Sequence, residues 1–276
     1  MFSKDLLGTI RAHPSDAAGP TFLEGTEEGA MIVAGEVRSP ASGETFTIKN
    51  GYLNLLQRRV GADNIANLGN FLPGAGRGYE PLWRVYSLTI LTGEPFPIER
   101  ELRIISELVH SERGGRYLDL GCSAGLYTRS LARELGDSGD VVGIDISPSM
   151  LKEAARRARE IGAKPSFARA DAENLQFADA SFSGALCGGT LNELGDPARA
   201  LRESRRVLEP GGRLAVMGIL RAGTPRGRRL QRLLSTGGIK FFDPDELLSL
   251  LDHSGFDPDS LQTNGAVFFA GATRRG

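Results

Sequence analysis

Short apolar runs alternate with amphipathic stretches through the second half of the chain, from about residue 113. Nearly continuous apolar runs at 117–120, 140–145, 166–170, 182–188 and 213–218 are typical of strands buried on both faces of a parallel sheet. Between them, apolar residues recur at helical spacing. Because helices between strands force parallel pairing, the pattern predicts a doubly wound α/β sheet over 113–276, with a hairpin near 261–273.

The first half of the chain has a different pattern. Residues 1–57 contain short strand-like runs at 30–36, 45–49 and 52–56, separated by Gly, Pro and Ser, which predicts a small β module outside the α/β core. Residues 58–112 are glycine-rich and then helical, with an amphipathic helix at 98–110. We therefore expect three parts, 1–57, 58–112 and 113–276.

Charge and cysteine content exclude several classes of protein. The chain has 33 Lys and Arg against 34 Asp and Glu, so its net charge does not favour nucleic acid or a membrane as partner. The two cysteines fall in predicted core segments, which is typical of a reducing compartment. Without an apolar run of about 18 residues or a signal-peptide pattern, the sequence predicts a cytoplasmic protein, monomeric or homodimeric.

The strand at 117–120 leads through five small residues, Gly121 to Gly125, into a helical pattern that begins at Leu126. Small residues let a ligand lie against the backbone, and the amides at the start of a helix point toward it. The dinucleotide fingerprint would require glycine at Ser123 and Leu126, and the phosphate loop would require a lysine in the turn. The turn matches neither pattern, and a cofactor without phosphates needs only close backbone approach and well-placed acids.

Acidic residues stand at the ends of two further predicted strands. Asp145 follows Gly121 at close to the spacing at which an acid meets ribose hydroxyls, and Asp171 follows the next strand, where with Ala172 it can bind an adenine edge. Ile146 and Met150 are placed to sandwich a purine. Asp119, Gly121 and the carbonyls near Cys187 and Gly188 are expected around the other end of the ligand.

These segments resemble, in order, the motifs of class I S-adenosylmethionine-dependent methyltransferases: YLDLGCSAG, VVGIDISPSML, ARADAENLQFADASF and ALRESRRVLEPGGRLAVMG. The resemblance implies a Rossmann-like sheet, S-adenosyl-L-methionine as cofactor and a small-molecule acceptor of specialised metabolism. The implied cofactor residues are Asp119, Gly121, Cys122, Ser123, Gly125, Asp145, Ile146, Met150, Asp171, Ala172, Cys187 and Gly188.

The N-terminal pattern GEVRSPASGETFTIKNGYLNLL resembles the second half of a zinc-ribbon module that is often fused ahead of such enzymes. Ser39 and Ser42 stand where the ribbon has cysteines, and His13 and Asp16 occupy the place of the first knuckle. Serine hydroxyls are poor zinc ligands at neutral pH, so we expect a degenerate ribbon without metal.

Catalytic residues are less well defined. Many relatives carry a histidine at the position of Asn192, and the neighbouring Glu193 is the better candidate to accept a proton. Tyr79, Trp83 and Tyr86, at roughly helical spacing, are candidates for a lid over the substrate. The absent histidine motivates an alternative function: a cyclase or pericyclase that binds the cofactor without transferring methyl.

Five arginines, Arg221, Arg226, Arg228, Arg229 and Arg232, follow the strand at 213–218. They could bind a carboxylate, a diphosphate or RNA, and an RNA methyltransferase is a further alternative. Because no aromatic residues are interleaved with them, we interpret the segment as a solvated helix face.

Overall fold

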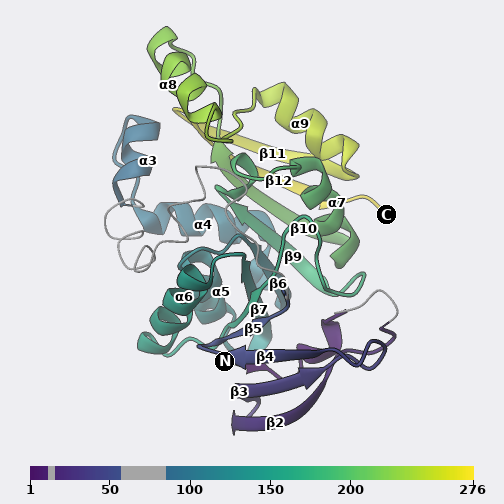
Figure 1. The fold of residues 1–276 in the computed structure, drawn as a ribbon. Coiled ribbons are helices and arrows are strands. Elements are labelled where there is room, and N and C mark those ends of the chain that lie inside the picture. Colours follow the sequence, from purple (N-terminus) through teal and green to yellow (C-terminus); the bar gives the residue numbers. More distant parts are fainter. Residues whose placement is uncertain (12–15, 57–84) are drawn as a thin grey trace.

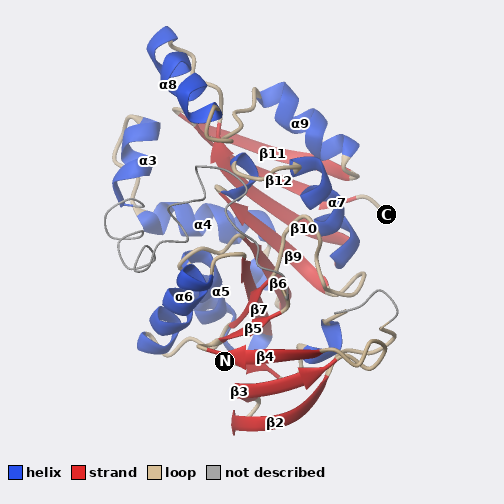
Figure 2. Ribbon diagram, in the orientation of Figure 1, coloured by secondary structure: helices blue, strands red, loops and turns tan. Residues whose placement is uncertain are grey.

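The computed structural model describes residues 1–11, 16–56 and 85–276. Within them a single sheet of 12 strands forms the centre of the molecule, with helices on both faces (Figures 1 and 2). The strands are β1 (Phe2–Ser3), β2 (Thr21–Glu28), β3 (Met31–Arg38), β4 (Thr45–Lys49), β5 (Tyr52–Asn54), β6 (Gly115–Leu120), β7 (Gly139–Asp145), β8 (Ser166–Arg169), β9 (Phe182–Gly188), β10 (Leu208–Ile219), β11 (Phe256–Asn264) and β12 (Val267–Arg274). The helices are α3 (Val85–Thr92), α4 (Ile98–Val109), α5 (Leu126–Leu135), α6 (Pro148–Glu160), α7 (Pro197–Val207), α8 (Pro225–Ser235) and α9 (Pro244–His253).

The central strands run in the order β5-β8-β7-β6-β9-β10 and pair in parallel, and β12 and β11 follow antiparallel at one end. This confirms the predicted α/β class, the parallel sheet and the terminal hairpin. Because the parallel strands share a direction, their carboxyl ends meet at one edge, where ligands bind in open α/β sheets.

Alternate residues of each strand supply the two layers of core. On β6, Tyr117 packs with α4 and α5, while Leu118 belongs to the core of the opposite face, to which α7 and α9 contribute. The helices between strands start as their sequences predict: Ser147 Oγ accepts the Met150 N–H at 3.4 Å and Asp196 Oδ1 accepts the Arg199 N–H at 3.0 Å.

The N-terminal strands join the central sheet. β5 pairs in parallel with β8 through Leu53 and Ala168, and β4, β3, β1 and β2 continue from it in antiparallel pairs (Figure 1). This corrects the expectation of a β module outside the α/β core, since the N-terminal strands belong to the same sheet. Apolar alternation in a short strand does not show which sheet the strand joins. The boundary near residue 57 lies beside undescribed residues and stays a prediction.

β10 and β2 differ from the sequence prediction for identifiable reasons. β10 starts at Leu208 rather than near 213, because the predicted Glu209–Gly212 turn is an irregularity within the strand, with Gly211 at φ +75°. β2 was not predicted, since this edge strand is mostly exposed and its sequence, TFLEGTEE, has no apolar face.

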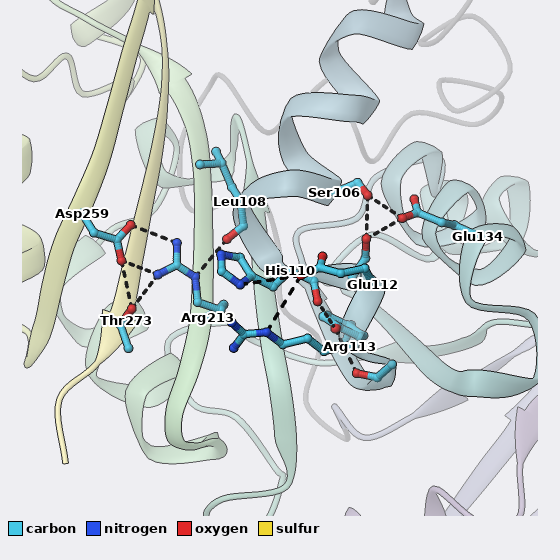
Figure 3. Close-up of polar contacts among 12 residues, drawn as sticks. Ser106, Leu108, His110, Glu112, Arg113, Glu134, Arg213, Asp259 and Thr273 are labelled. Atoms are coloured by element: carbon cyan, nitrogen blue, oxygen red, sulfur yellow. Dashed lines mark hydrogen bonds and ion pairs between the residues drawn. The ribbon is translucent and has the colours of Figure 1, made fainter.

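Arg213 connects four elements at the far end of α4 (Figure 3). The buried guanidinium donates to Asp259 Oδ1 of β11 at 2.9 Å, to Asp259 Oδ2, to Thr273 Oγ1 of β12 at 2.5 Å and to the Leu108 carbonyl of α4 at 3.1 Å. The hydrogen bonds from Arg213 hold the pKa of Asp259 below its usual range. One side chain thus joins the terminal hairpin to α4, the helix that packs on β9 and β10.

Replacement of Arg213 by Met should lower the free energy of unfolding by roughly 2–3 kcal/mol, because a buried carbonyl and a carboxylate lose charged donors. Arg275→Met is the matched control: Arg275 pairs with Asp252 and Asp257 at the surface, where solvent screens ion pairs, so its replacement should cost clearly less stability. Urea denaturation measures both, and equal losses in the two variants would contradict the assigned role.

Candidate functional site

The turn between β6 and α5 depends on backbone conformations that favour glycine. Gly121, Ser123 and Gly125 have φ of +67°, +51° and +77°. Ser123 therefore stands where a glycine would be relaxed, which explains physically why glycine is usual at this position of the motif. The turn is closed by the Gly125 N–H, which donates to the Cys122 carbonyl at 2.8 Å.

Gly121 also lies against the loop after β9. A Cβ at Gly121 would stand 2.2 Å from Thr190 Oγ1, whose hydroxyl donates to the Gly121 carbonyl at 3.2 Å. A larger residue would separate the two loops. The close approach thus fixes the turn relative to Thr190–Asn192, a single 3-10 turn that follows β9.

Asp145, at the end of β7, holds the turn from the neighbouring strand. Its Oδ2 accepts the Ser123 N–H at 2.9 Å and its Oδ1 accepts the Ser147 N–H at 2.8 Å. Burial raises the pKa of Asp145, and the backbone donors partly oppose that rise. The carboxylate thus organises both the turn and the start of α6.

Asp119 and the two cysteines lie beside this carboxylate. Asp119 is buried and accepts the Thr128 hydroxyl at 2.6 Å. Burial raises the pKa of the Cys122 thiol well above its usual value, and the charges of Asp119 and Asp145 raise it further. Burial likewise raises the pKa of Cys187 to about 12, with Asp119 and Glu193 contributing. Both cysteines are therefore neutral packing groups at physiological pH.

Glu193 follows the 3-10 turn, and its N–H donates to the Thr190 carbonyl at 2.8 Å. Burial, and then the charge of Asp145, raises the pKa of Glu193 to about 7. A carboxyl group with this pKa exchanges a proton near neutral pH, as a general base must. The interaction also shows that the structure brings Asp145 and Glu193, which are far apart in sequence, to the same edge of the sheet.

The side chain of Asn192 is buried and hydrogen-bonded to backbone groups. Its Nδ2 donates to the carbonyls of Ile219 and Lys240 at 2.9 and 2.7 Å, and its Oδ1 accepts the Ile219 N–H at 2.9 Å. Three of the four hydrogen bonds that the amide can make go to backbone, and the side chain is 2% exposed. This arrangement joins the end of β10 to residue 240 and provides no group for proton transfer.

The predicted adenine-side residues form the next part of the edge. The Ala170 N–H donates to the Asp145 carbonyl at 3.3 Å. Asp171 directly follows Ala170, so it lies close to the end of β7. Asp171 Oδ1 accepts the Glu173 N–H at 2.9 Å, so the carboxylate is positioned by its own turn. Ile146 is half-buried and follows Asp145, while Met150 is buried in the first turn of α6.

Two sets of predicted residues fall partly outside the described part of the chain. Tyr79 and Trp83 lie outside it, and Tyr86 is in α3, where only the backbone is described. His13 is also outside it, whereas the Ser39 hydroxyl donates to Asp16 Oδ1 at 2.7 Å. Within residues 1–11, 16–56 and 85–276, no group of three His, Cys, Asp or Glu residues converges as a metal site.

The sequence interpretation missed Glu101 and Tyr127. Tyr127 Oη donates to Glu101 Oε1, and the Glu101 side chain is fully buried on α4. A Cβ at Gly188 would stand 2.0 Å from the Tyr127 ring, so the glycine at the end of β9 makes room for this pair. A single glutamate in a helix rich in charged residues carries no signal of burial, and only the three-dimensional packing reveals it.

A family model described as "Methyltransferase domain" matches residues 118–216. Among curated proteins, the chain is similar to 2-phytyl-1,4-naphtoquinone methyltransferase of Nostoc punctiforme, with 36% identity over 125 residues, which cover 45% of this chain and 54% of the relative. The chain spans about half the length of the curated relatives it matches.

Solved structures share the fold at lower identity. The [4+2]-cyclase SpnF aligns with a TM-score of 0.57 at 22% identity, over 72% of this chain and 94% of the cyclase. Phospholethanolamine N-methyltransferase 2 of Haemonchus contortus, solved with phosphomonomethylethanolamine and S-adenosylhomocysteine, aligns with a TM-score of 0.58 at 17% identity, over 72% of this chain and 59% of that one. At these identities the likeness shows the fold alone.

Three findings agree with one another. They are the family match, the parallel sheet with its terminal antiparallel hairpin, and the turn after β6 that is bound by an acid on the next strand. The cofactor of this family is S-adenosyl-L-methionine. Residues 118–216 of the chain thus match a methyltransferase domain, and the sheet that carries them has the Rossmann-like fold of class I methyltransferases.

Proposed function

We propose that this protein transfers the methyl group of S-adenosyl-L-methionine to a small-molecule acceptor. The observation that carries the proposal is the grouping of Asp119, Asp145 and Glu193 around a glycine-dependent turn at the carboxyl edge of the sheet. The cofactor carries two positive centres, a sulfonium and an ammonium, and buried carboxylates stabilise such a ligand.

The residues at the edge fit this cofactor in chemistry and in backbone shape. Asp145 keeps acceptor capacity for ribose hydroxyls after binding the Ser123 and Ser147 amides. Asp171 and Ala172 would bind the adenine, with Ile146 and Met150 beside the ring. Asp119, Gly121, Cys122, Ser123, Gly125, Cys187 and Gly188 would surround the amino-acid end.

When bound, the cofactor would supply an electrophilic methyl group for the acceptor atom, with the S–CH₃ electron pair left on sulfur. The enzyme aligns the acceptor, excludes water and removes the proton that a protonated acceptor atom loses. We assign the last role to Glu193, since its raised pKa suits a general base at neutral pH. Asn192 would position this loop through its backbone hydrogen bonds.

For the acceptor, the similarity to 2-phytyl-1,4-naphtoquinone methyltransferase favours an apolar aromatic ring, in the reduced, nucleophilic quinol form. A natural product with a comparable phenolic or enolic ring fits the same chemistry. We place this reaction in the cytoplasm, where Cys122 and Cys187 remain free thiols. Among the described residues no helix is long and apolar enough to cross a bilayer.

Cyclisation without methyl transfer is the second candidate function, and the likeness in fold to the SpnF cyclase motivates it. A labelling experiment distinguishes the two reactions. Incubation with cofactor labelled in the methyl group and a panel of prenylated naphthoquinols and phenols should move label into product. Cyclised product without label would overturn methyl transfer.

Asp145→Ala should weaken binding of S-adenosylmethionine by about 100-fold or more, because it removes both a ligand acceptor and the anchor of the turn. Isothermal titration calorimetry measures this directly. Asp140→Ala, at the opposite end of β7 and beside Arg116, is the matched control and should bind like the wild type. Unchanged binding by Asp145→Ala would remove this residue from the site.

Glu193→Gln should lower kcat by about 10²-fold or more with an acceptor that loses a proton, since positioned bases contribute factors of this size. In the wild type kcat should rise with pH and level off above about 7, where Glu193 is ionised, and the variant should lose this rise. Glu160→Gln, on exposed α6, is the control. An unchanged pH profile in Glu193→Gln would show that another group accepts the proton.

The carboxyl group of Glu193 also makes the free energy of unfolding depend on pH. Its folded pKa of about 7 exceeds the unfolded value of 4.5, so the folded state holds the proton more tightly and loses stability as pH rises between these values. Without cofactor, Glu193→Gln should match the wild type at pH 4.5 and exceed it by roughly 1–3 kcal/mol at pH 8. Urea denaturation at both values tests this, and equal stability at pH 8 would contradict it.

A further inference from the structure

Helix α8 presents an apolar face to solvent. Leu230, Leu233 and Leu234 are 59%, 67% and 40% exposed, and their spacing of three and four residues places them together on one side of the helix. Side chains of this size are normally buried, and a cluster of them on one exposed face marks an interaction surface.

A neighbouring side of α8 is fixed to the body of the protein through Gln231. Gln231 is buried, its Nε2 donates to the Leu220 carbonyl at 2.8 Å, and its Oε1 accepts the Ala222 N–H at 2.7 Å. Thr224 caps the helix by accepting the Gly227 N–H at 3.1 Å. Figure 1 shows α8 projecting beyond the end of the sheet, so these contacts hold the leucines facing outward.

Arginines flank the leucines. Arg226 and Arg229 lie four residues before Leu230 and Leu233, and with Arg232 they are exposed. In the described part of the chain, no carboxylate lies within ion-pair distance of these three guanidinium groups. The helix is therefore amphipathic with a cationic border, although the whole chain has a formal net charge of −1.

Another exposed apolar side chain, Ile90, lies on α3, which is connected to the same part of the sheet as α8. Ile90 of α3 is 77% exposed. The carbonyl of the next residue, Leu91, accepts the Ala266 N–H at 2.9 Å, and the Ala266 carbonyl accepts the N–H of Leu220 at 2.7 Å. Because Gln231 of α8 also binds Leu220, α3 and α8 are both attached to the contact between Leu220 and Ala266, just beyond the carboxyl end of β10.

We propose that α8 docks on the surface of an anionic lipid bilayer, with its leucines in the interface and its arginines on lipid phosphates. A basic helix with an apolar face binds membranes in this way. RNA would engage the arginines but would leave the leucines exposed. A second copy of α8 would bring like-charged arginines together, so charge complementarity favours an anionic lipid.

Co-sedimentation of the full chain with phosphatidylcholine vesicles, with and without phosphatidylglycerol, tests the proposal. Binding should require phosphatidylglycerol and weaken as salt is raised. Combined Arg226→Gln, Arg229→Gln and Arg232→Gln should weaken it on the order of 100-fold. Combined Leu230→Ser and Leu233→Ser should weaken it by about tenfold or more at unchanged charge.

Matched controls change the same chemistry elsewhere. Arg133→Gln, Lys152→Gln and Lys164→Gln remove three exposed charges, and Ile161→Ser removes a 43% exposed apolar side chain from the end of α6. These variants should bind vesicles like the wild type, and circular dichroism checks that all variants are folded. Vesicle binding needs no acceptor, so this proposal and the proposed function fail separately.

Three results would overturn the proposal. The first is no binding of the wild type to phosphatidylglycerol vesicles at low salt. The second is undiminished binding by the α8 variants. The third is a homodimer in solution that the leucine substitutions convert to a monomer, which would assign the face to a second copy of the chain.

Discussion

The contact on which the site depends is the hydrogen bond from the Ser123 amide to Asp145. The turn after β6 contains three residues with positive φ, and such a segment keeps one shape only if its surroundings hold it there. Asp145 provides that restraint from the adjacent strand, because parallel pairing of β6 and β7 sets the register of their carboxyl ends. Thr190 restrains the turn from the other side through Gly121. The local shape of the turn is thus a property of three strands.

The same restraint has an electrostatic consequence. An acid buried to hold a turn also acts on its neighbours, and the charge of Asp145 contributes to the raised pKa of Glu193 and of Cys122. A structural anchor and a tuned proton acceptor are therefore coupled. When a cation enters such a group of carboxylates, it stabilises their ionised forms, so we expect the protonation of Glu193 to respond to occupancy of the site.

The sequence predicted the parts whose physical signal is local. Continuous apolar runs identified β7 and β9 to within one residue, and Ser147 and Asp196 cap the helices that they were expected to start. The parts it missed depend on contacts between distant residues. The pairing of Leu53 with Ala168 has no counterpart in either local pattern, and the backbone partners of Asn192, at residues 219 and 240, are also distant from it in sequence. Glu101 could not be recognised as buried without Tyr127.

The pairing of β5 with β8 determines where the central sheet stops. A parallel α/β sheet that ended at β8 would present unpaired backbone groups, which invite pairing between molecules. Here the N-terminal strands cover that side, and the new boundary is β2, an exposed strand that carries Glu24, Glu27 and Glu28. Repulsion between such acidic edges discourages stacking of copies. The N-terminal strands β1–β5 thus move the edge of the sheet from β8 to β2.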